Sequence, residues 1–283
     1  MTAPEARRTI AAGGHSVLAD PPDGKPLLVL LRMAARGAGL WDAVWAPLGR
    51  RYRVAQFDLP MPTTAALAHP REVFGALAEA ACDVAEALGH ARFSVFGWNG
   101  GCHVALRAAA SAADRIASCL LLGPFHAPAE PRVVERGLEF LRVMYERGDP
   151  RLYAYYWFLS GLSPRFVAAN FDRVEGWVAQ RVAGDRFLAN DPARALAWMR
   201  ALRGAWLTDD ELASIRCPTL ILAHSLDLWH AGPTAEMAQA LHARIPGSRL
   251  HVLTDVGSLV LLEDPGRVVS AIDTFTDDQR RPA

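Results

Sequence analysis

Short runs of apolar residues alternate along the chain with longer segments whose apolar residues recur every three or four positions. The runs at residues 26–31 (PLLVLL), 116–122 (IASCLLL) and 218–223 (PTLILA) have the length and continuity of strands buried on both faces. In residues 71–88 the apolar side chains have helical spacing instead, and the segment is followed by Gly89, a residue type that commonly ends helices. This alternation of strands and helices predicts a mostly parallel, doubly wound α/β sheet.

The same patterns predict the other elements of the core. Further strands are expected at residues 52–57, 93–96 and 249–253, and further helices at residues 37–49, 101–113, 233–245 and 264–275. The segment TIAAGGHSVLAD, at residues 9–20, can form an antiparallel hairpin at one edge of the sheet.

Residues 126–216 interrupt this alternation. They contain helical stretches rich in aromatic residues and no clear strand. We therefore predict an α/β core made of residues 1–125 and 217–283, with residues 126–216 inserted as an all-helical cap.

Composition narrows the function classes. The chain has 283 residues, of which 51% are hydrophobic and 21% charged, as in a globular protein that buries a full core. Its 30 basic residues balance its 30 acidic residues, so the basic excess typical of nucleic-acid binding is lacking. We expect a small-molecule substrate or ligand and no nucleic-acid partner. A homodimer is compatible with the sequence.

Cysteine spacing and hydropathy give further expectations. The four cysteines form no CxxC pair, so the sequence predicts buried reduced thiols and neither a zinc site nor a disulfide framework. No apolar segment has the length of a membrane span or the form of a signal peptide. We therefore predict a cytoplasmic protein with no membrane association, and we expect no metal or organic cofactor.

The segment FSVFGWNGG, at residues 93–101, runs a predicted strand into a predicted helix through a turn flanked by glycines. In a G-x-S-x-G turn, small residues allow a strained bend that projects one side chain at the top of the sheet, and here that residue is Asn99. With WDAVWAPLGRRYRVAQFDLP, CPTLILAHSLD and DVGSLVLLEDP, the chain resembles the α/β-hydrolase superfamily over nearly its whole length. The resemblance implies the α/β-hydrolase fold with a helical cap.

The resemblance also assigns three positions to a catalytic triad. Asn99 stands at the nucleophile position, Asp227 at the acid position and Ser258 at the position of the histidine. A carboxamide is no effective nucleophile, and without the imidazole no base near pH 7 is available to activate one. We predict an atypical member that has lost Ser-His-Asp hydrolysis, with these three as candidate catalytic residues.

Arg32 and Met33 replace the family's His-Gly pair, next to which the oxyanion hole forms. The guanidinium of Arg32 can bind a carboxylate or phosphate of a ligand, or it can pair internally with Asp227 or Asp58. The remaining candidate binding residues are Trp98, Gly100, His126, His224 and His230. The three histidines follow carboxyl ends of predicted strands, where open α/β sheets bind ligands, and each is either a pocket base or a hydrogen-bonded loop or core residue. His103 is expected to pack under the turn.

Four functions are compatible with these residues, and they are given from the most to the least favoured. The first is a cofactor-free, non-hydrolytic enzyme of proton-transfer, epimerisation, lyase or cyclisation type, like some atypical members of the superfamily that work in specialised metabolism. The second is a catalytically silent small-molecule-binding protein, and the third is a scaffold with a collapsed pocket. A residual hydrolase is the fourth and least favoured. The sequence leaves the substrate, the reaction and the oligomeric state open.

Overall fold

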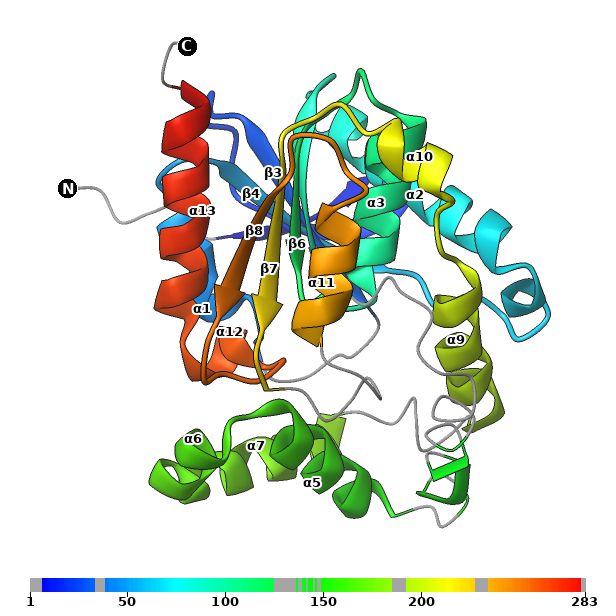
Figure 1. The fold of residues 1–283 in the computed structure, drawn as a ribbon, viewed down its shortest axis with the longest axis vertical. Coiled ribbons are helices and arrows are strands. Elements are labelled where there is room, and N and C mark those ends of the chain that lie inside the picture. The colour runs from blue at the N-terminus through cyan, green and yellow to red at the C-terminus, as the bar shows by residue number, and fades with distance from the viewer. Residues whose placement is uncertain are drawn as a thin grey trace.

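The computed structural model describes residues 7–33, 39–124, 136, 139–140, 142–144, 146, 149–184, 192–226 and 234–280. They form one eight-stranded sheet with helices on both faces (Figure 1). This confirms the predicted fold class, a mostly parallel doubly wound α/β sheet.

The strand order in the sheet is β1-β2-β4-β3-β5-β6-β7-β8. The strands are β1 (Arg8–Ala12), β2 (His15–Ala19), β3 (Leu27–Met33), β4 (Arg53–Leu59), β5 (Phe93–Trp98), β6 (Ile116–Leu122), β7 (Thr219–His224) and β8 (Arg249–Leu253). Strands β1 and β2 form the predicted antiparallel hairpin at one edge, and β3 to β8 run parallel to one another. All carboxyl ends of the parallel strands therefore meet at one edge of the sheet.

Two layers of helices bury the faces of the sheet. Helices α1 (Asp42–Gly49) and α13 (Pro265–Arg280) cover one face, and α2 (Pro70–Ala87), α3 (Gly101–Ser111) and α11 (Thr234–His242) cover the other (Figure 1). The side chains of β3 alternate between the two layers, since Val29 and Leu31 pack with the α2 and α3 side whereas Leu28 and Leu30 pack with the α1 side. Arg32 continues this alternation on the α1 side.

The described part of the chain between β6 and β7 contains helices and no strand. These helices are α5 (Pro150–Gly161), α6 (Pro164–Ala169), α7 (Phe171–Gly184), α9 (Pro192–Gly204) and α10 (Asp209–Ala213). Helices α5, α6 and α7 lie beyond the arrowheads of β7 and β8, across the carboxyl ends of the strands (Figure 1). Helix α9 lies apart from them, and its Trp198 stacks on Phe74 of α2 at 5.3 Å. The cap boundaries at residues 126 and 216 stay a prediction.

Local sequence signals start the first two of these helices. The carboxylate of Asp149 accepts hydrogen bonds from the backbone N–H groups of Arg151 and Leu152, and the hydroxyl of Ser163 accepts one from Phe166. A proline follows each capping residue, at a position where its missing N–H costs nothing. The dipeptides Asp-Pro and Ser-Pro thus fix where α5 and α6 begin.

The boundaries of several elements differ from those predicted. Strands β3, β4 and β7 extend beyond the apolar runs to Met33, Leu59 and His224, because backbone pairing continues after the first polar side chain. The predicted last helix starts at Pro265 and runs on to Arg280, and a short helix, α12 (Val260–Glu263), precedes it. A 3₁₀ turn, η1 (Ala66–Ala68), precedes α2.

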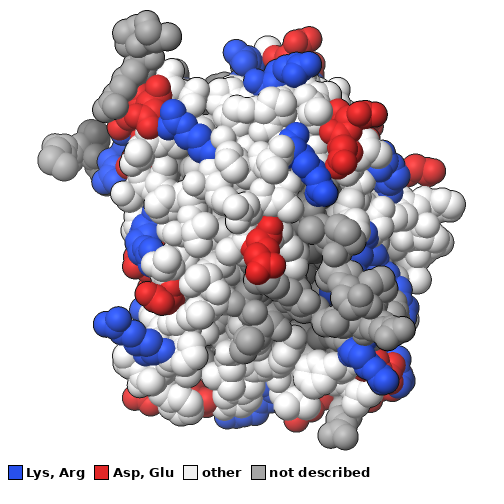
Figure 2. Space-filling view, in the orientation of Figure 1, with Lys and Arg blue, Asp and Glu red and all other residues white. Residues whose placement is uncertain are grey.

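Charges are mixed over the surface. Figure 2 shows basic and acidic side chains scattered over the visible face, with no large area of one sign. Within the described residues, no helix is both long and apolar enough to span a bilayer. Nor do the described His, Cys, Asp and Glu side chains gather in a group of three or more that could hold a metal ion.

Candidate functional site

The turn between β5 and α3 has the strained backbone that the sequence predicts. Asn99 has a φ of +53°, a left-handed conformation that few residues other than glycine and asparagine adopt readily. Its backbone N–H donates to the carbonyl of Leu122 at the end of β6, 2.9 Å away, and its own carbonyl accepts from the N–H of Cys102, also at 2.9 Å. Asn99 is half-buried, between the fully buried Trp98 and Gly100. We call this turn the elbow.

Two glycines of the elbow are required by sterics. A Cβ at Gly97 would lie 2.6 Å from the carbonyl carbon and oxygen of Gly101, and a Cβ at Gly101 would lie 2.4 Å from the carbonyl oxygen of Leu31 in β3. Both distances are too short for any side chain. The strand and the helix therefore pack as closely as predicted, whatever residue stands at the apex.

Trp98 joins three parts of the site. It is buried, and its indole N–H donates to the carbonyl of Ser258, 3.0 Å away. Its ring also lies edge-on to that of Trp157 in α5, with the ring centroids 6.3 Å apart. These contacts bring the elbow, the turn after β8 and α5 together. They also place Trp98 in the interior, with its N–H already bonded.

Ser258 lies in the turn between β8 and α12 and is only 1% exposed. Among the described residues its hydroxyl finds no hydrogen-bond partner. A buried hydroxyl without a partner is costly, and such groups are uncommon in folded proteins. The sequence-predicted candidates Asn99 and Ser258 are thus brought into neighbouring positions through Trp98, and the hydroxyl of Ser258 has no hydrogen-bond partner within the part of the chain that the structure describes.

The end of α5 is tied to this turn by close backbone contacts, which we call the glycine junction. The carbonyl of Gly161 accepts from the N–H of Leu259 at 2.8 Å, and a Cβ at Gly257 would lie 2.3 Å from that same carbonyl oxygen. The carboxylate of Glu263 accepts from the backbone N–H groups of Ser163, at 3.1 Å, and Gly257, at 3.2 Å, and from the hydroxyl of Ser163. One acidic side chain thus holds both α5–α6 and the turn of Ser258.

Arg32 pairs within the protein. Its guanidinium donates from Nε to Oδ1 of Asp58 at 2.9 Å and from Nη2 to Oδ2 at 2.7 Å. The two residues are cross-strand neighbours in the register of β3 and β4, and Gln56 donates to the same carboxylate at 2.8 Å. Of the internal partners considered from the sequence, Asp58 therefore satisfies Arg32. This bidentate pair joins the carboxyl ends of β3 and β4.

His224 is the last residue of β7 and is 1% exposed. Its ring packs against Gly123, which follows β6, so that a Cβ at Gly123 would lie 2.7 Å from Nε2. Since Gly123 adjoins Leu122, whose carbonyl binds the elbow, His224 lies at the same edge of the sheet as Asn99.

Of the remaining predicted site residues, two lie in described elements and three do not. Gly100 is the N-cap of α3, and Met33 ends β3 opposite Leu59. His126, Asp227 and His230 lie outside the described residues. Their assignment as candidate acid, base or binding residues stays a prediction.

The groups under the elbow are structural. Cys102 donates its thiol to the carbonyls of Gly97, at 3.2 Å, and Leu122, at 3.5 Å, and burial raises its pKa. It is therefore a neutral thiol and no substitute nucleophile. His103 is buried with its ring 5.6 Å from that of Phe74, which agrees with the predicted packing. All four cysteines are buried and free, as expected.

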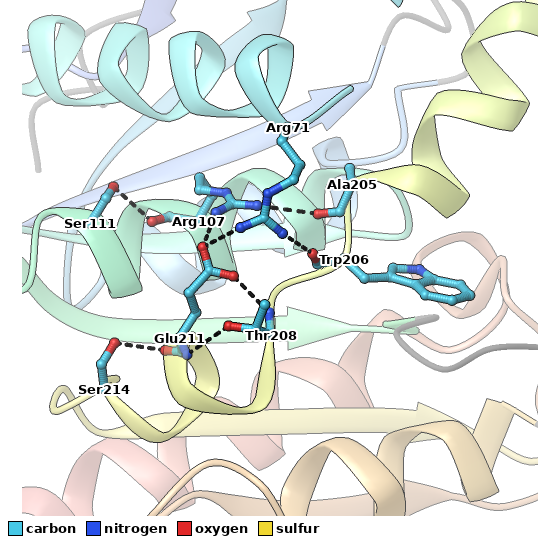
Figure 3. A network of polar contacts seen from close by, with 8 residues as sticks. All are labelled: Arg71, Arg107, Ser111, Ala205, Trp206, Thr208, Glu211 and Ser214. Carbon is cyan, nitrogen blue, oxygen red and sulfur yellow. Dashed lines mark hydrogen bonds and ion pairs between the residues drawn. The ribbon is translucent and has the colours of Figure 1, made fainter. Parts of the chain in front are cut away.

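A second polar cluster, which sequence reasoning missed, joins α10 to α2 and α3 (Figure 3). The carboxylate of Glu211 accepts from Arg71 at 2.7 Å, from Arg107 at 2.6 Å and from the backbone N–H of Thr208 at 2.6 Å. Burial favours the neutral acid, but the hydrogen bonds from Arg71 and Thr208 and the charge of Arg107 outweigh it and lower the pKa of Glu211 to about 2. We call this group the Glu211 cluster.

Part of the Glu211 cluster has a sequence signal. Thr208 and Glu211 form a capping box, and their spacing, T-x-x-E, is a known helix-start motif. The two arginines lie over a hundred positions away in sequence, so nothing local announces them. Glu263 and Ser163 likewise meet across 100 positions.

Comparison with known proteins agrees with this geometry. Over residues 28–271 the chain matches the model of the alpha/beta hydrolase family. It is 27% identical over 280 residues to the pimeloyl-[acyl-carrier protein] methyl ester esterase of Nitrosomonas europaea, with 88% of this chain and 95% of the relative covered.

Solved structures share the fold at low sequence identity. The alpha/beta hydrolase enzyme MGS-M2, from a Medee basin deep-sea metagenome library, superposes with a TM-score of 0.76 at 16% identity, over 98% of this chain and 99% of that one. The 2-hydroxy-6-oxo-6-phenylhexa-2,4-dienoate hydrolase of Rhodococcus sp. strain RHA1 superposes with a TM-score of 0.73 at 18% identity, over 96% and 100%. The sheet, the elbow and the helices across its edge define an α/β-hydrolase fold. The chain belongs to the alpha/beta hydrolase family.

Proposed function

We propose that this protein holds a small molecule at the elbow and acts on it without Ser-His-Asp hydrolysis, as a cofactor-free enzyme of proton-transfer, epimerisation, lyase or cyclisation type. The observation that carries the proposal is the apex of the elbow. The strained backbone and both close-packed glycines are retained, while the projecting side chain is the carboxamide of Asn99. A carboxamide can donate and accept hydrogen bonds but cannot form an acyl-enzyme at neutral pH.

Ser258 supports the same proposal. Its buried hydroxyl has no partner among the described residues, although it stands where the family has a histidine. An amide and a hydroxyl can both donate to an enolate or alkoxide as its negative charge develops, which is the task of an oxyanion hole. We propose that one of four residues accepts the proton in this scheme, namely His224, Asp227, His126 or His230.

A catalytically silent binding protein is the second candidate. The internal pairing of Arg32 with Asp58 favours it, because a cation that already has a bidentate partner offers less to a charged substrate or transition state. Hydrolysis is the third candidate, since the relative from Nitrosomonas europaea carries the name of an esterase. We favour the non-hydrolytic enzyme over hydrolysis because Asn99 and Ser258 stand at the nucleophile and base positions of this chain.

The first experiment tests for hydrolysis with p-nitrophenyl acetate and butyrate. We expect no burst and no turnover by the wild-type protein above the level of Asn99→Ala and Asp227→Ala controls. Asn99→Ser alone stays inactive because Ser258 still stands in place of the histidine that would activate the new serine, and only Asn99→Ser combined with Ser258→His produces an acyl-enzyme burst. Wild-type turnover that Asn99→Ala abolishes would contradict the proposal.

A second experiment separates an enzyme from a binding protein. Small molecules that co-purify with the protein are identified by mass spectrometry after denaturation and then returned to fresh protein in D₂O. A proton-transfer enzyme exchanges a carbon-bound proton of that molecule for deuterium, and Asn99→Ala slows the exchange. A silent binding protein holds the molecule without exchange.

A further inference from the structure

Helix α5 has two apolar faces, and only one of them packs on the core. Ala154, Trp157, Phe158 and Gly161 are buried and face α7 and the turn of Ser258. Because successive helical residues turn by about 100°, Leu152 and Leu159 lie on the opposite side, where they are 43% and 46% exposed. This outer side of α5 faces away from the elbow.

A groove runs along this outer side. It has a volume of about 630 Å³ and lies between α5 and the helical residues that precede it. The residues that line it are Phe140, Val143, Met144, Leu152, Tyr155, Tyr156, Leu159 and Ser160. Four of them, Phe140, Val143, Leu152 and Leu159, are large hydrophobic residues with exposed side chains. Such a concentration of exposed apolar side chains is characteristic of a binding surface.

The polar groups at the groove are already engaged. The hydroxyl of Tyr155 donates to Glu175 at 2.5 Å, and that of Ser160 donates to the carbonyl of Tyr156. Of the flanking charges, Arg142 pairs with Glu139 and Glu146, and Arg151 pairs with Glu175. The described surroundings thus present paired charges with no basic excess, which disfavours an anionic ligand or an anionic lipid surface.

The size of the groove also limits its occupant. Its volume of about 630 Å³ falls within the range of about 300–1,000 Å³ typical of small-molecule pockets. We propose that this groove, which we call the outer groove, is a second binding site of the protein, for a neutral small molecule with an aliphatic or aromatic body.

The test uses the neutral fluorescent probe N-phenyl-1-naphthylamine. Leu159→Glu and Val143→Glu each place a charge in the outer groove, at exposed positions that tolerate it in the folded protein. We expect each to weaken probe binding by at least about tenfold, since burial of one such side chain has that effect on affinity. The matched control is Phe171→Glu, at an exposed hydrophobic residue of α7 outside the groove, and it leaves binding unchanged.

Three results would overturn the proposal. Equal probe affinity in the wild type and both groove variants would mean that the probe binds elsewhere. Sedimentation with neutral phosphatidylcholine vesicles that both groove variants abolish would identify a membrane-docking face instead. A dimer in analytical ultracentrifugation that both variants dissociate would identify the groove as a contact between two copies. Circular dichroism and urea unfolding verify that each variant is folded.

Discussion

Two of the regions that tie the helices between β6 and β7 to the core do so by different means. The glycine junction, beside the elbow, uses backbone hydrogen bonds and a glycine contact that admits no Cβ. The Glu211 cluster, at α10, uses one carboxylate shared by two arginines and a backbone N–H (Figure 3). The first region depends mainly on the close approach of two backbones, with the carboxylate of Glu263 bonded to Ser163 and Gly257 beside it, and the second depends on a charge shared by three donors.

The difference teaches how each attachment can fail. The backbones of Gly257 and Gly161 lie so close together that no side-chain atom fits between them. A side chain added at Gly257 would have to displace one of these backbones, and this would disturb the turn of Ser258. The side chains of Arg71 and Arg107 are flexible and can adjust to small changes of shape. They lose their ionic partner, however, when the carboxylate of Glu211 is neutralised. The glycine junction is therefore sensitive to shape, and the Glu211 cluster is sensitive to protonation.

The largest effect is expected from Gly257→Ala. The added methyl group would lie 2.3 Å from the carbonyl oxygen of Gly161 and would push α5 away from the turn of Ser258. We expect the free energy of unfolding to fall by about 3 kcal/mol, as measured by urea denaturation. The matched control is Gly176→Ala in α7, where a Cβ meets nothing within 4 Å. It should raise the stability by about 0.5–1 kcal/mol because alanine favours helix. Equal effects of both substitutions would refute the steric argument.

A smaller effect is expected from Glu211→Gln. This change keeps the shape of the side chain but leaves the guanidinium of Arg107, whose side chain is only 10% exposed, without its counter-charge. We expect the protein to lose about 2 kcal/mol of stability at pH 7. The control is Glu139→Gln, which breaks an exposed pair with Arg142 and should leave the unfolding curve unchanged. If Glu211→Gln unfolded at the same urea concentration as the wild type, the charge of Glu211 would contribute nothing to stability.

The smallest effect is a dependence on acid pH. The pKa of Glu211 is lowered from 4.5 to about 2 in the folded protein, so the carboxylate stabilises the fold above pH 4.5 and loses this contribution as the pH falls towards 2. Since the side chain is partly exposed, screening limits the contribution to about 1 kcal/mol. The stability difference between the wild type and Glu211→Gln should therefore shrink between pH 6 and pH 3. A difference that stays constant over this range would exclude protonation of Glu211 as its cause.

The sequence predicts the core of the fold well, because the information for it is local. Apolar runs such as residues 116–122 mark strands with both faces buried, and residue types such as Gly97 and Gly101 mark a turn where only glycine fits. The exact ends of β3 and β7 escape prediction because backbone pairing continues past the end of each continuous apolar run, to Met33 and His224.

The site is only partly predictable for the same reason. Asn99 and Ser258 are found from motifs that are continuous in sequence, and Arg32 is found because it stands where the resembling family has a histidine-glycine pair. The partner of Arg32 is settled only by the register of β3 and β4, which sets it opposite Asp58. Glu263 and Gly161 could not be foreseen, because their contacts depend on how α5 crosses the sheet edge, which no local pattern encodes.

The glycine junction also constrains how a ligand can reach Asn99. While Gly161 stays bonded to Leu259 and Ser163 to Glu263, this end of α5 is a fixed point relative to the sheet. A motion of α5 that kept these contacts would pivot about Gly161, and its amplitude would grow along the helix towards Pro150. Hinge motions of this kind occur in microseconds to milliseconds. Such a swing would keep the contacts at Gly161 and would separate groups farther along α5, among them the rings of Trp157 and Trp98.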